Sequence, residues 1–197
     1  LILSLKRIFI TGCGDSHHAT INTELAFETL TGLPCETQQA LQFARYSAGF
    51  IPQPGPTTNL VIGILVSGAV ARTYEGMQLA KAAGATILAL SATPGSRVAL
   101  AGDILFQVPN PPFPDPEGVH TPGVRSFIVN QYALIMIAIR IGEVRGHITS
   151  AQAADLRKEL MGVADVIEQT IAENDAAALK LARDWKDATE FVFVGGG

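Results

Sequence analysis

The segment Leu60-Val-Ile-Gly-Ile-Leu-Val66 decides the fold, because it carries no polar side chain at any position. A strand with one face in water alternates apolar and polar residues, whereas a strand of a parallel sheet, covered by helices on both faces, is apolar throughout. Ser67-Gly68 follows the run, and residues 69–83 then show a helical pattern that ends at Gly84. This predicts a buried strand that leads into a helix.

The same succession of strand, turn and helix extends in both directions along the chain. Shorter β-rich runs alternate with helical patterns, and the alternation is typical of parallel strands joined by right-handed helical crossovers. We expect strands at residues 7–11, 33–37, 86–90 and 103–108, and helices at 16–30, 38–47 and 96–101. The sequence therefore predicts a doubly wound α/β fold, a three-layer sandwich around a five-stranded parallel sheet.

Beyond a proline-rich connector, the C-terminal part of the chain is mainly helical. Helical patterns cover residues 124–145, 149–173 and 175–186, with Thr149 or Ser150 as the N-cap of the second. The last segment, Glu190-Phe-Val-Phe-Val-Gly-Gly-Gly197, repeats the design of Ile8-Phe-Ile-Thr-Gly-Cys-Gly14. We expect an α/β domain over residues 1–147, a helical extension over 148–188, and the first strand of a second α/β unit over 189–197. A chance likeness of two strand-then-glycine segments is the alternative.

Composition excludes several classes of protein. With 48% hydrophobic and 16% charged residues the chain is that of a folded domain. A net charge of −4 without a basic block predicts no nucleic-acid partner. The uninterrupted apolar run at residues 132–139 is too short to cross a membrane. Cys13 and Cys35 suit neither a disulfide framework nor a zinc site, so we expect a cytoplasmic protein with reduced thiols and no bound metal.

Two glycine-containing turns are candidate binding loops, because each follows a predicted strand at the edge where doubly wound sheets bind ligands. They are Gly12-Cys-Gly-Asp-Ser16 and Ser67-Gly68-Ala69. Each leads into a helix N-terminus, where free backbone N–H groups favour an anion such as phosphate. Tight turns with simple N-caps are the alternative interpretation, and neither turn matches a complete nucleotide-binding motif.

These turns, taken with their neighbours, resemble the sugar isomerase (SIS) domain family. The resemblance covers about residues 6–145 and includes four segments: Gly-Cys-Gly-Asp-Ser-His-His-Ala19, Ser67-Gly68, Ala85-Thr-Ile-Leu-Ala-Leu-Ser91 and Ala101-Gly-Asp103. The chain is most similar to the isomerase half of glucosamine-6-phosphate synthases, in which two SIS domains stand in tandem. The resemblance implies a flavodoxin-like SIS domain that binds a phosphorylated hexose or hexosamine, forms a homodimer and needs no cofactor.

The resemblance also implies which residues contact the sugar phosphate. They lie in the first turn, in the phosphate loop and in a late loop before the long helix: Gly14, Asp15, Ser16, Ser67, Gly68, Ala69, Val70, Thr121 and Arg125. The family's phosphate loop is Ser-x-Ser-Gly-Glu-Thr, but here it reads Leu65-Val-Ser-Gly-Ala-Val70. The missing hydroxyls should weaken phosphate binding or change its mode. Arg125 or Arg72 could supply a guanidinium, although a solvated surface position is the simpler interpretation of Arg72.

The resemblance implies that the acid and base groups of the reaction lie outside this chain. In glucosamine-6-phosphate synthases the acid and base groups come chiefly from the second SIS domain and from a partner subunit. We interpret His17 and His18 as ordinary helix residues, Cys13 as a packed turn residue, and Glu117 and His120 as weak alternatives. The predicted function is thus phosphosugar binding, as the N-terminal half of a tandem sugar-phosphate isomerase or amino-sugar-phosphate deaminase or aminotransferase. A non-catalytic phosphosugar-sensing or dimerisation module is the alternative.

Overall fold

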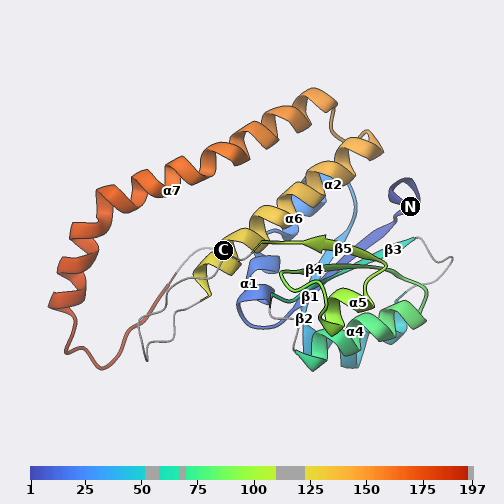
Figure 1. Cartoon of the computed structure of the whole chain (residues 1–197), viewed down its shortest axis with the longest axis horizontal. Helices are drawn as coiled ribbons and strands as arrows, with labels where there is room; N and C mark the ends of the chain where they lie inside the picture. The colour runs from blue at the N-terminus through green and yellow to red at the C-terminus, as the bar shows by residue number, and fades with distance from the viewer. Residues whose placement is uncertain (52–57, 67–69, 110–122, 195–197) are drawn as a thin grey trace. The chain divides into compact units, whose positions relative to one another are not determined.

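Five parallel strands form the centre of the first of two compact units, Leu1–Ala154 and Asp155–Gly197 (Figure 1). In this computed structural model, residues 1–51, 58–66, 70–109 and 123–194 are described. The strands are β1 (Arg7–Gly12), β2 (Cys35–Gln39), β3 (Asn59–Ile64), β4 (Thr86–Ser91) and β5 (Ile104–Gln107). Their order across the sheet is β2-β1-β3-β4-β5, and every neighbouring pair is parallel. The predicted five-stranded parallel sheet is confirmed.

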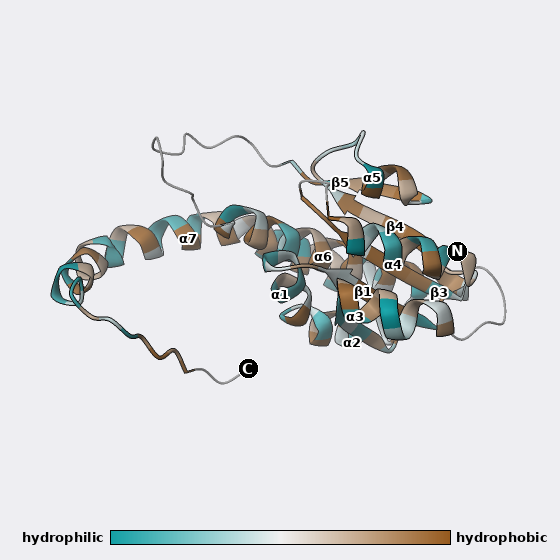
Figure 2. Ribbon diagram, turned by 90° about the horizontal axis from the view of Figure 1, so that it is seen from below, coloured by the Kyte–Doolittle hydropathy of each residue, from teal (hydrophilic) through white to brown (hydrophobic). Residues whose placement is uncertain are grey.

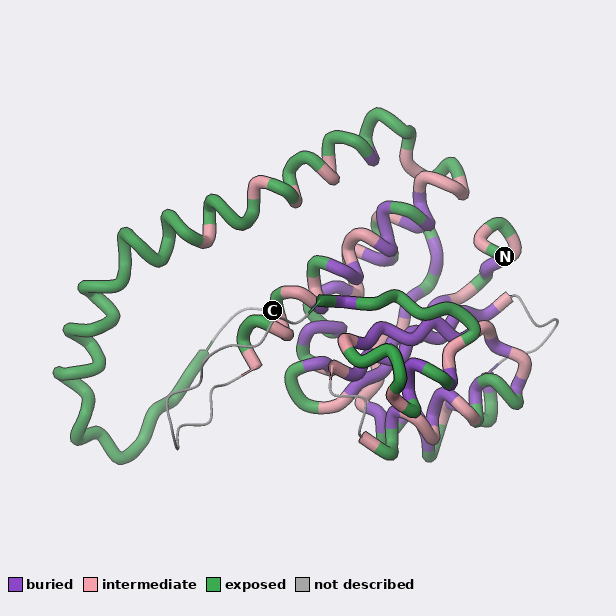
Figure 3. Tube along the Cα trace, viewed as in Figure 1, coloured by how far each residue is buried: buried purple, intermediate pink, exposed green. Residues whose placement is uncertain are grey.

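Helices cover both faces of this sheet, as the apolar strands require (Figure 2). The α-helices of the unit are α1 (Asp15–Ile21), α2 (Glu24–Thr31), α3 (Ala40–Gln42), α4 (Ala71–Ala82), α5 (Arg97–Ala101) and α6 (Val124–Arg145). Short turns of other helix types are η1 (Ile2–Ser4), the π-helix η2 (Phe43–Ser47) and η3 (Ala48–Phe50). Figure 3 shows that β1, β3 and β4 and the inward faces of the helices are largely buried, whereas the edge strand β5 is exposed.

Alternate strand residues enter two separate cores, one on each face. Ile8 and Ile10 of β1 pack with Phe27 of α2 and Leu134 of α6. The intervening Phe9 packs on the opposite face, in the core that contains Phe43 of η2, Val61 of β3 and Met77 of α4. Successive strand side chains point to opposite faces, so the two cores confirm the three-layer arrangement.

Three predicted elements differ from the structure for local reasons. The helix predicted over 16–30 is divided into α1 and α2, because the Thr23 hydroxyl bonds the carbonyls of Ala19 and Thr20 at the break. The predicted strand 33–37 begins at Cys35, after a proline that has no N–H to donate. The helix predicted over 38–47 is replaced by α3 and η2, which start after Gln39 caps the N–H groups of Leu41 and Gln42.

The C-terminal part contains one long helix, α7 (Ser150–Asp184), where we predicted two. Thr149 is its N-cap and forms a capping box with Gln152. The side chain of Asn174, at the predicted break, instead donates to the Thr170 carbonyl 2.9 Å away, within the same helix. Residues 190–194 have no regular secondary structure. The strand predicted there, as the start of a second unit, therefore stays a prediction.

Helix α6 is the one helix in the described ranges that could cross a membrane by its length and composition. One face of it is buried, with Leu134, Ala138 and Ile141 inside the core on the sheet. We interpret it as a core helix, as expected from its sequence.

Candidate functional site

The order of the strands reverses between β1 and β3, which is where doubly wound sheets bind ligands beyond the carboxyl ends of the strands. From β1 the chain proceeds to β2 on one side, and from β3 it proceeds to β4 on the other. Thr11 of β1 is paired with Gly63 of β3, so the two carboxyl ends lie side by side. The residues after both strands therefore define the candidate site.

The loop after β1 is shaped by a glycine with a left-handed backbone. Gly14 has φ +55°, a conformation that side-chain-bearing residues adopt with strain, and it is the N-cap of α1. Its carbonyl accepts the backbone N–H of His18 at 3.1 Å and lies 2.9 Å from His18 Nδ1. Asp15 follows as an exposed residue and Ser16 as a buried one. Gly14, Asp15 and Ser16 thus stand at the predicted edge.

The start of α6 lies against this loop. A Cβ placed on Gly123, the N-cap of α6, would be 2.6 Å from Asp15 Oδ2 and 3.0 Å from Ser126 Oγ. The Ser126 hydroxyl donates to the Gly123 carbonyl at 2.8 Å. Arg125 is exposed in the first turn of the same helix. The structure therefore brings the predicted Asp15 and the late-loop segment together, while Thr121 lies outside the described residues.

The start of α4 and the end of β2 reach the same loop through Cys13. The Thr73 hydroxyl of α4 lies 3.9 Å from Cys13 Sγ, and Gln39 Nε2 of β2 lies 4.0 Å from it. Sulfur is a weak acceptor, so these contacts matter for placement more than for energy. Val70, the N-cap of α4, is half-buried. Ser67, Gly68 and Ala69 lie outside the described residues.

Sequence reasoning missed Thr73, Gln39 and Gly123, which all border the loop. Thr73 could have been found, because it lies one turn into the helix after the candidate phosphate loop and would face the sheet. Gly123 was part of the late segment but carried no side chain to attract notice. Gln39 belongs to an edge strand whose register shows only in the structure.

Among the ionisable residues of α1 and α2, His17 has a ring nitrogen without a hydrogen-bond partner in the described part of the chain, whereas Glu24 is hydrogen-bonded to β2. Burial, and secondarily the neighbouring His18, lowers the pKa of His17, so its ring is neutral at pH 7. His17 Nδ1 is buried without a hydrogen-bond partner in the described part of the chain. Glu24 instead accepts the N–H and hydroxyl of Thr37 and anchors α2 to β2. Glu117 and His120 lie outside the described residues.

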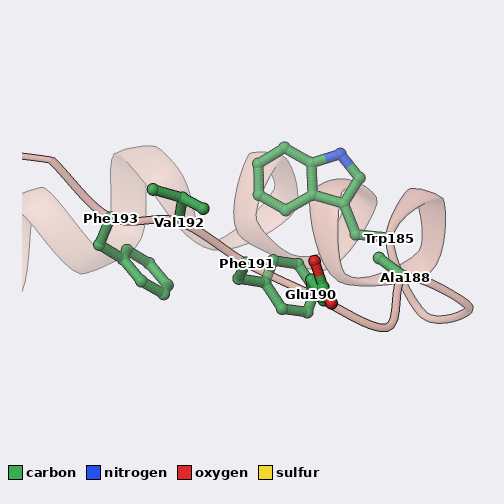
Figure 4. Close-up of a pocket in the computed structure, with 6 residues that line it drawn as sticks. All are labelled: Trp185, Ala188, Glu190, Phe191, Val192 and Phe193. Atoms are coloured by element: carbon green, nitrogen blue, oxygen red, sulfur yellow. The ribbon is translucent and has the colours of Figure 1, made fainter.

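In the described parts of the chain, no group of three or more His, Cys, Asp or Glu side chains could hold a metal ion. A hollow of about 350 Å³ in the second unit is lined by Trp185, Ala188, Glu190, Phe191, Val192 and Phe193 (Figure 4). Its lining contains a carboxylate and no basic side chain, so it does not suit a phosphate.

Comparisons with known proteins show the family to which the chain belongs. The SIS domain model matches residues 1–140. The glutamine–fructose-6-phosphate aminotransferase of Gloeobacter violaceus is 27% identical and matches 100% of this chain, and that of Streptomyces coelicolor is 26% identical and matches 99%. The chain spans only 31% and 30% of the length of these relatives.

Solved structures show the same fold. The C-terminal domain of glucosamine-fructose-6-phosphate aminotransferase from Francisella tularensis superposes with a TM-score of 0.79 at 20% identity, over 94% of this chain and 49% of that one. Glucosamine-6-phosphate deaminase from Thermotoga maritima gives 0.56 at 18% identity, over 77% of this chain and 43% of that one. Because the SIS domain model matches residues 1–140 of the 197 in this chain, the chain belongs to the SIS domain family.

Proposed function

We propose that this domain binds a phosphorylated hexose or hexosamine at the carboxyl edge of β1 and β3. The observation that carries the proposal is the meeting of three segments at that edge. Asp15 contacts the start of α6 at Gly123, and Cys13 contacts the start of α4 at Thr73. These segments offer a carboxylate, hydroxyl groups and backbone N–H groups, which suit the hydroxyls and the phosphate of a sugar phosphate.

We further propose that the domain serves as the N-terminal half of a tandem sugar-phosphate isomerase, deaminase or isomerising aminotransferase, in a cytoplasmic homodimer. The relatives named for such a reaction are about three times as long as this chain, which spans 31% of the first of them. Moving a proton between two sugar carbons needs an acid–base group within hydrogen-bond reach of the substrate. We assign that group to residues outside this chain, while Asp15 and Ser16 hold the sugar.

A non-catalytic phosphosugar sensor is the second candidate, and the residues that flank the phosphate loop favour it. Leu65 and Val70 have aliphatic side chains, so neither offers a hydroxyl to a ligand. A sensor can bind a sugar phosphate without converting it. Proton exchange at the second carbon of the sugar, followed by NMR in deuterated water on the full-length protein, separates the two, since only a catalyst promotes it.

The proposed function is tested with a panel of ligands. Fructose 6-phosphate, glucose 6-phosphate and glucosamine 6-phosphate are compared with the free sugars and with inorganic phosphate in thermal unfolding. A ligand present at 100 times its Kd stabilises the folded state by about 2.7 kcal/mol, which shifts the Tm measurably. We expect a shift for at least one sugar phosphate. The absence of a shift with all three would contradict phosphosugar binding.

Ligand protection of Cys13 gives a second test that reports the position of the site. Cys13 is half-buried in the loop after β1, whereas Cys35 is 3% exposed. Burial, together with the charges of Glu24 and Glu28, raises the pKa of the Cys35 thiol far above its usual range. Since the thiolate is the reactive form, we expect iodoacetamide to label Cys13 and not Cys35 in the folded protein.

A bound sugar phosphate should slow the labelling of Cys13, measured by mass spectrometry of the intact protein and its peptides. Cys35 serves as the internal control for unfolding, and Cys13→Ser should abolish labelling. Labelling of Cys13 at the same rate with and without a ligand that shifts the Tm would place that ligand elsewhere.

A further inference from the structure

Two arginines from different segments converge on one glutamate at the start of α4. Arg72 Nη1 donates to Glu75 Oε2 at 2.5 Å, and Arg45 Nη2 lies 3.6 Å from Glu75 Oε1. The Arg72 hydrogen bond, more than the charge of Arg45, lowers the pKa of Glu75, which is therefore ionised at pH 7. Two positive charges and one negative charge leave this arginine cluster (Arg45, Arg72 and Glu75) with a net charge of about +1 in a chain of net charge −4.

Close packing of η2 on α4 brings the two arginines together. A Cβ on Gly76 would lie 2.9 Å from Cδ1 of Phe43, a fully buried ring that could not move aside. The missing side chain at Gly76 thus lets η2 approach α4, and Arg45 reaches Glu75 as a result. η2 is a π-helix. Helices of this type are rare in proteins, and those that occur are often found at functional sites.

The arginine cluster is next to the candidate site in the chain and in space. Arg72 immediately precedes Thr73, whose hydroxyl contacts Cys13 in the loop after β1. The Arg72 guanidinium contacts Glu75, so it lies beside the first two turns of α4. The first turn of α4 contains no acidic residue, and its N-cap Val70 has no side-chain hydrogen bond.

We propose that Arg72, supported by Arg45, binds the phosphate group of the sugar phosphate and sets the preference for phosphorylated over unphosphorylated sugars. This inference rests on the proposed function. A guanidinium has five N–H donors in a planar fork that matches two phosphate oxygens, and the bond to Glu75 occupies only part of it. The fork offers hydrogen-bond donors that the side chains of Leu65 and Val70 do not have.

The test compares Arg72→Ala and Arg45→Ala with a matched control in the full chain. Arg140 pairs with Glu143 at the same i, i+3 spacing and is also exposed, but it lies in the C-terminal half of α6. Calorimetry gives the Kd of each variant for the sugar phosphate with the largest Tm shift in the panel and for the corresponding free sugar. Circular dichroism and Tm establish that each variant is folded.

We expect Arg72→Ala to weaken binding of the sugar phosphate by about 10-fold or more, the size of a lost charge-assisted hydrogen bond. Arg45→Ala should have a smaller effect in the same direction. Arg140→Ala should stay within about 2-fold of the unmodified protein, as exposed pairs contribute little. The affinity for the free sugar should not change in any variant.

The outcomes separate this inference from the proposed function. If the unmodified protein binds a sugar phosphate but Arg72→Ala behaves like Arg140→Ala, the phosphate contact is wrong and phosphosugar binding stands. If the unmodified protein binds no sugar phosphate in the panel, both are wrong. If Arg72→Ala lost affinity equally for the sugar phosphate and for the free sugar, the assignment would also be contradicted, since Arg72 would then contact the sugar and not the phosphate.

Discussion

Replacing Gly142 by alanine should lower the free energy of unfolding by about 3 kcal/mol, the upper part of the range for overpacking a core. Gly142 is buried in α6 where this helix crosses the end of α2. A Cβ at this position would lie 2.0 Å from the backbone oxygen of Leu30 and 3.3 Å from Ile148 Cγ1. A backbone oxygen cannot rotate away as a side chain can, so the two helices must separate. Urea unfolding followed by circular dichroism measures the loss.

Gly162→Ala is the matched control for this substitution. Gly162 is also inside a helix, α7, but a Cβ there meets no atom within 4 Å. Alanine has a higher helix propensity than glycine by about 1 kcal/mol, so this variant should be unchanged or slightly more stable. If Gly142→Ala were as stable as Gly162→Ala, the close crossing of α2 and α6 would be wrong.

The strands were predictable because most of them contain a run of consecutive β-forming residues, and the run in β3 is apolar throughout. Residues 60–66 could not be a surface helix or a half-buried strand, and β3 occupies Asn59–Ile64 as expected. The helix boundaries were less predictable, because single side chains decided them. The Thr23 hydroxyl separates α1 from α2, and the Asn174 amide bonds back into α7, yet threonine and asparagine can either interrupt or continue a helix.

The part of the candidate site that one turn forms by itself, the loop after β1, was predictable from the sequence. Gly14 does have the positive φ that a tight turn before a helix requires, and Asp15 and Ser16 follow it at the carboxyl edge. What the sequence could not provide is the set of neighbours from other elements. The approach of Gly123 to Asp15 and of Thr73 to Cys13 depends on how α6 and α4 pack, and residues more than 50 positions apart meet there.

This arrangement places opposite charges on two sides of the loop after β1, and each charge suits a different part of a sugar phosphate. Asp15 lies on the side of α6, and the arginine cluster lies on the side of α4. A carboxylate repels a phosphate, so Asp15 suits the hydroxyls of the sugar, whose O–H groups donate to it. The guanidinium side suits the phosphate. A sugar phosphate that spans the loop would satisfy both.

Asp15→Ala should therefore weaken binding of the sugar phosphate and of the free sugar by the same factor. A hydrogen bond to a charged group contributes about 1.5–3 kcal/mol, which corresponds to about 10- to 150-fold in Kd. Asp15 is exposed, so we expect no large loss of stability. Calorimetric titration of both ligands measures the factor, and Asp15→Asn, which keeps one acceptor oxygen, should fall between the alanine variant and the unmodified protein.

The matched control is Asp184→Ala, which removes an exposed carboxylate paired with Lys180 at the end of α7. It should leave both affinities unchanged, because it alters the net charge equally without touching the loop. If Asp15→Ala and Asp184→Ala bound the sugar phosphate equally well, Asp15 would have no contact with the sugar. If Asp15→Ala instead bound the sugar phosphate more tightly, the carboxylate would lie near the phosphate, and the two sides of the loop would have to exchange their roles.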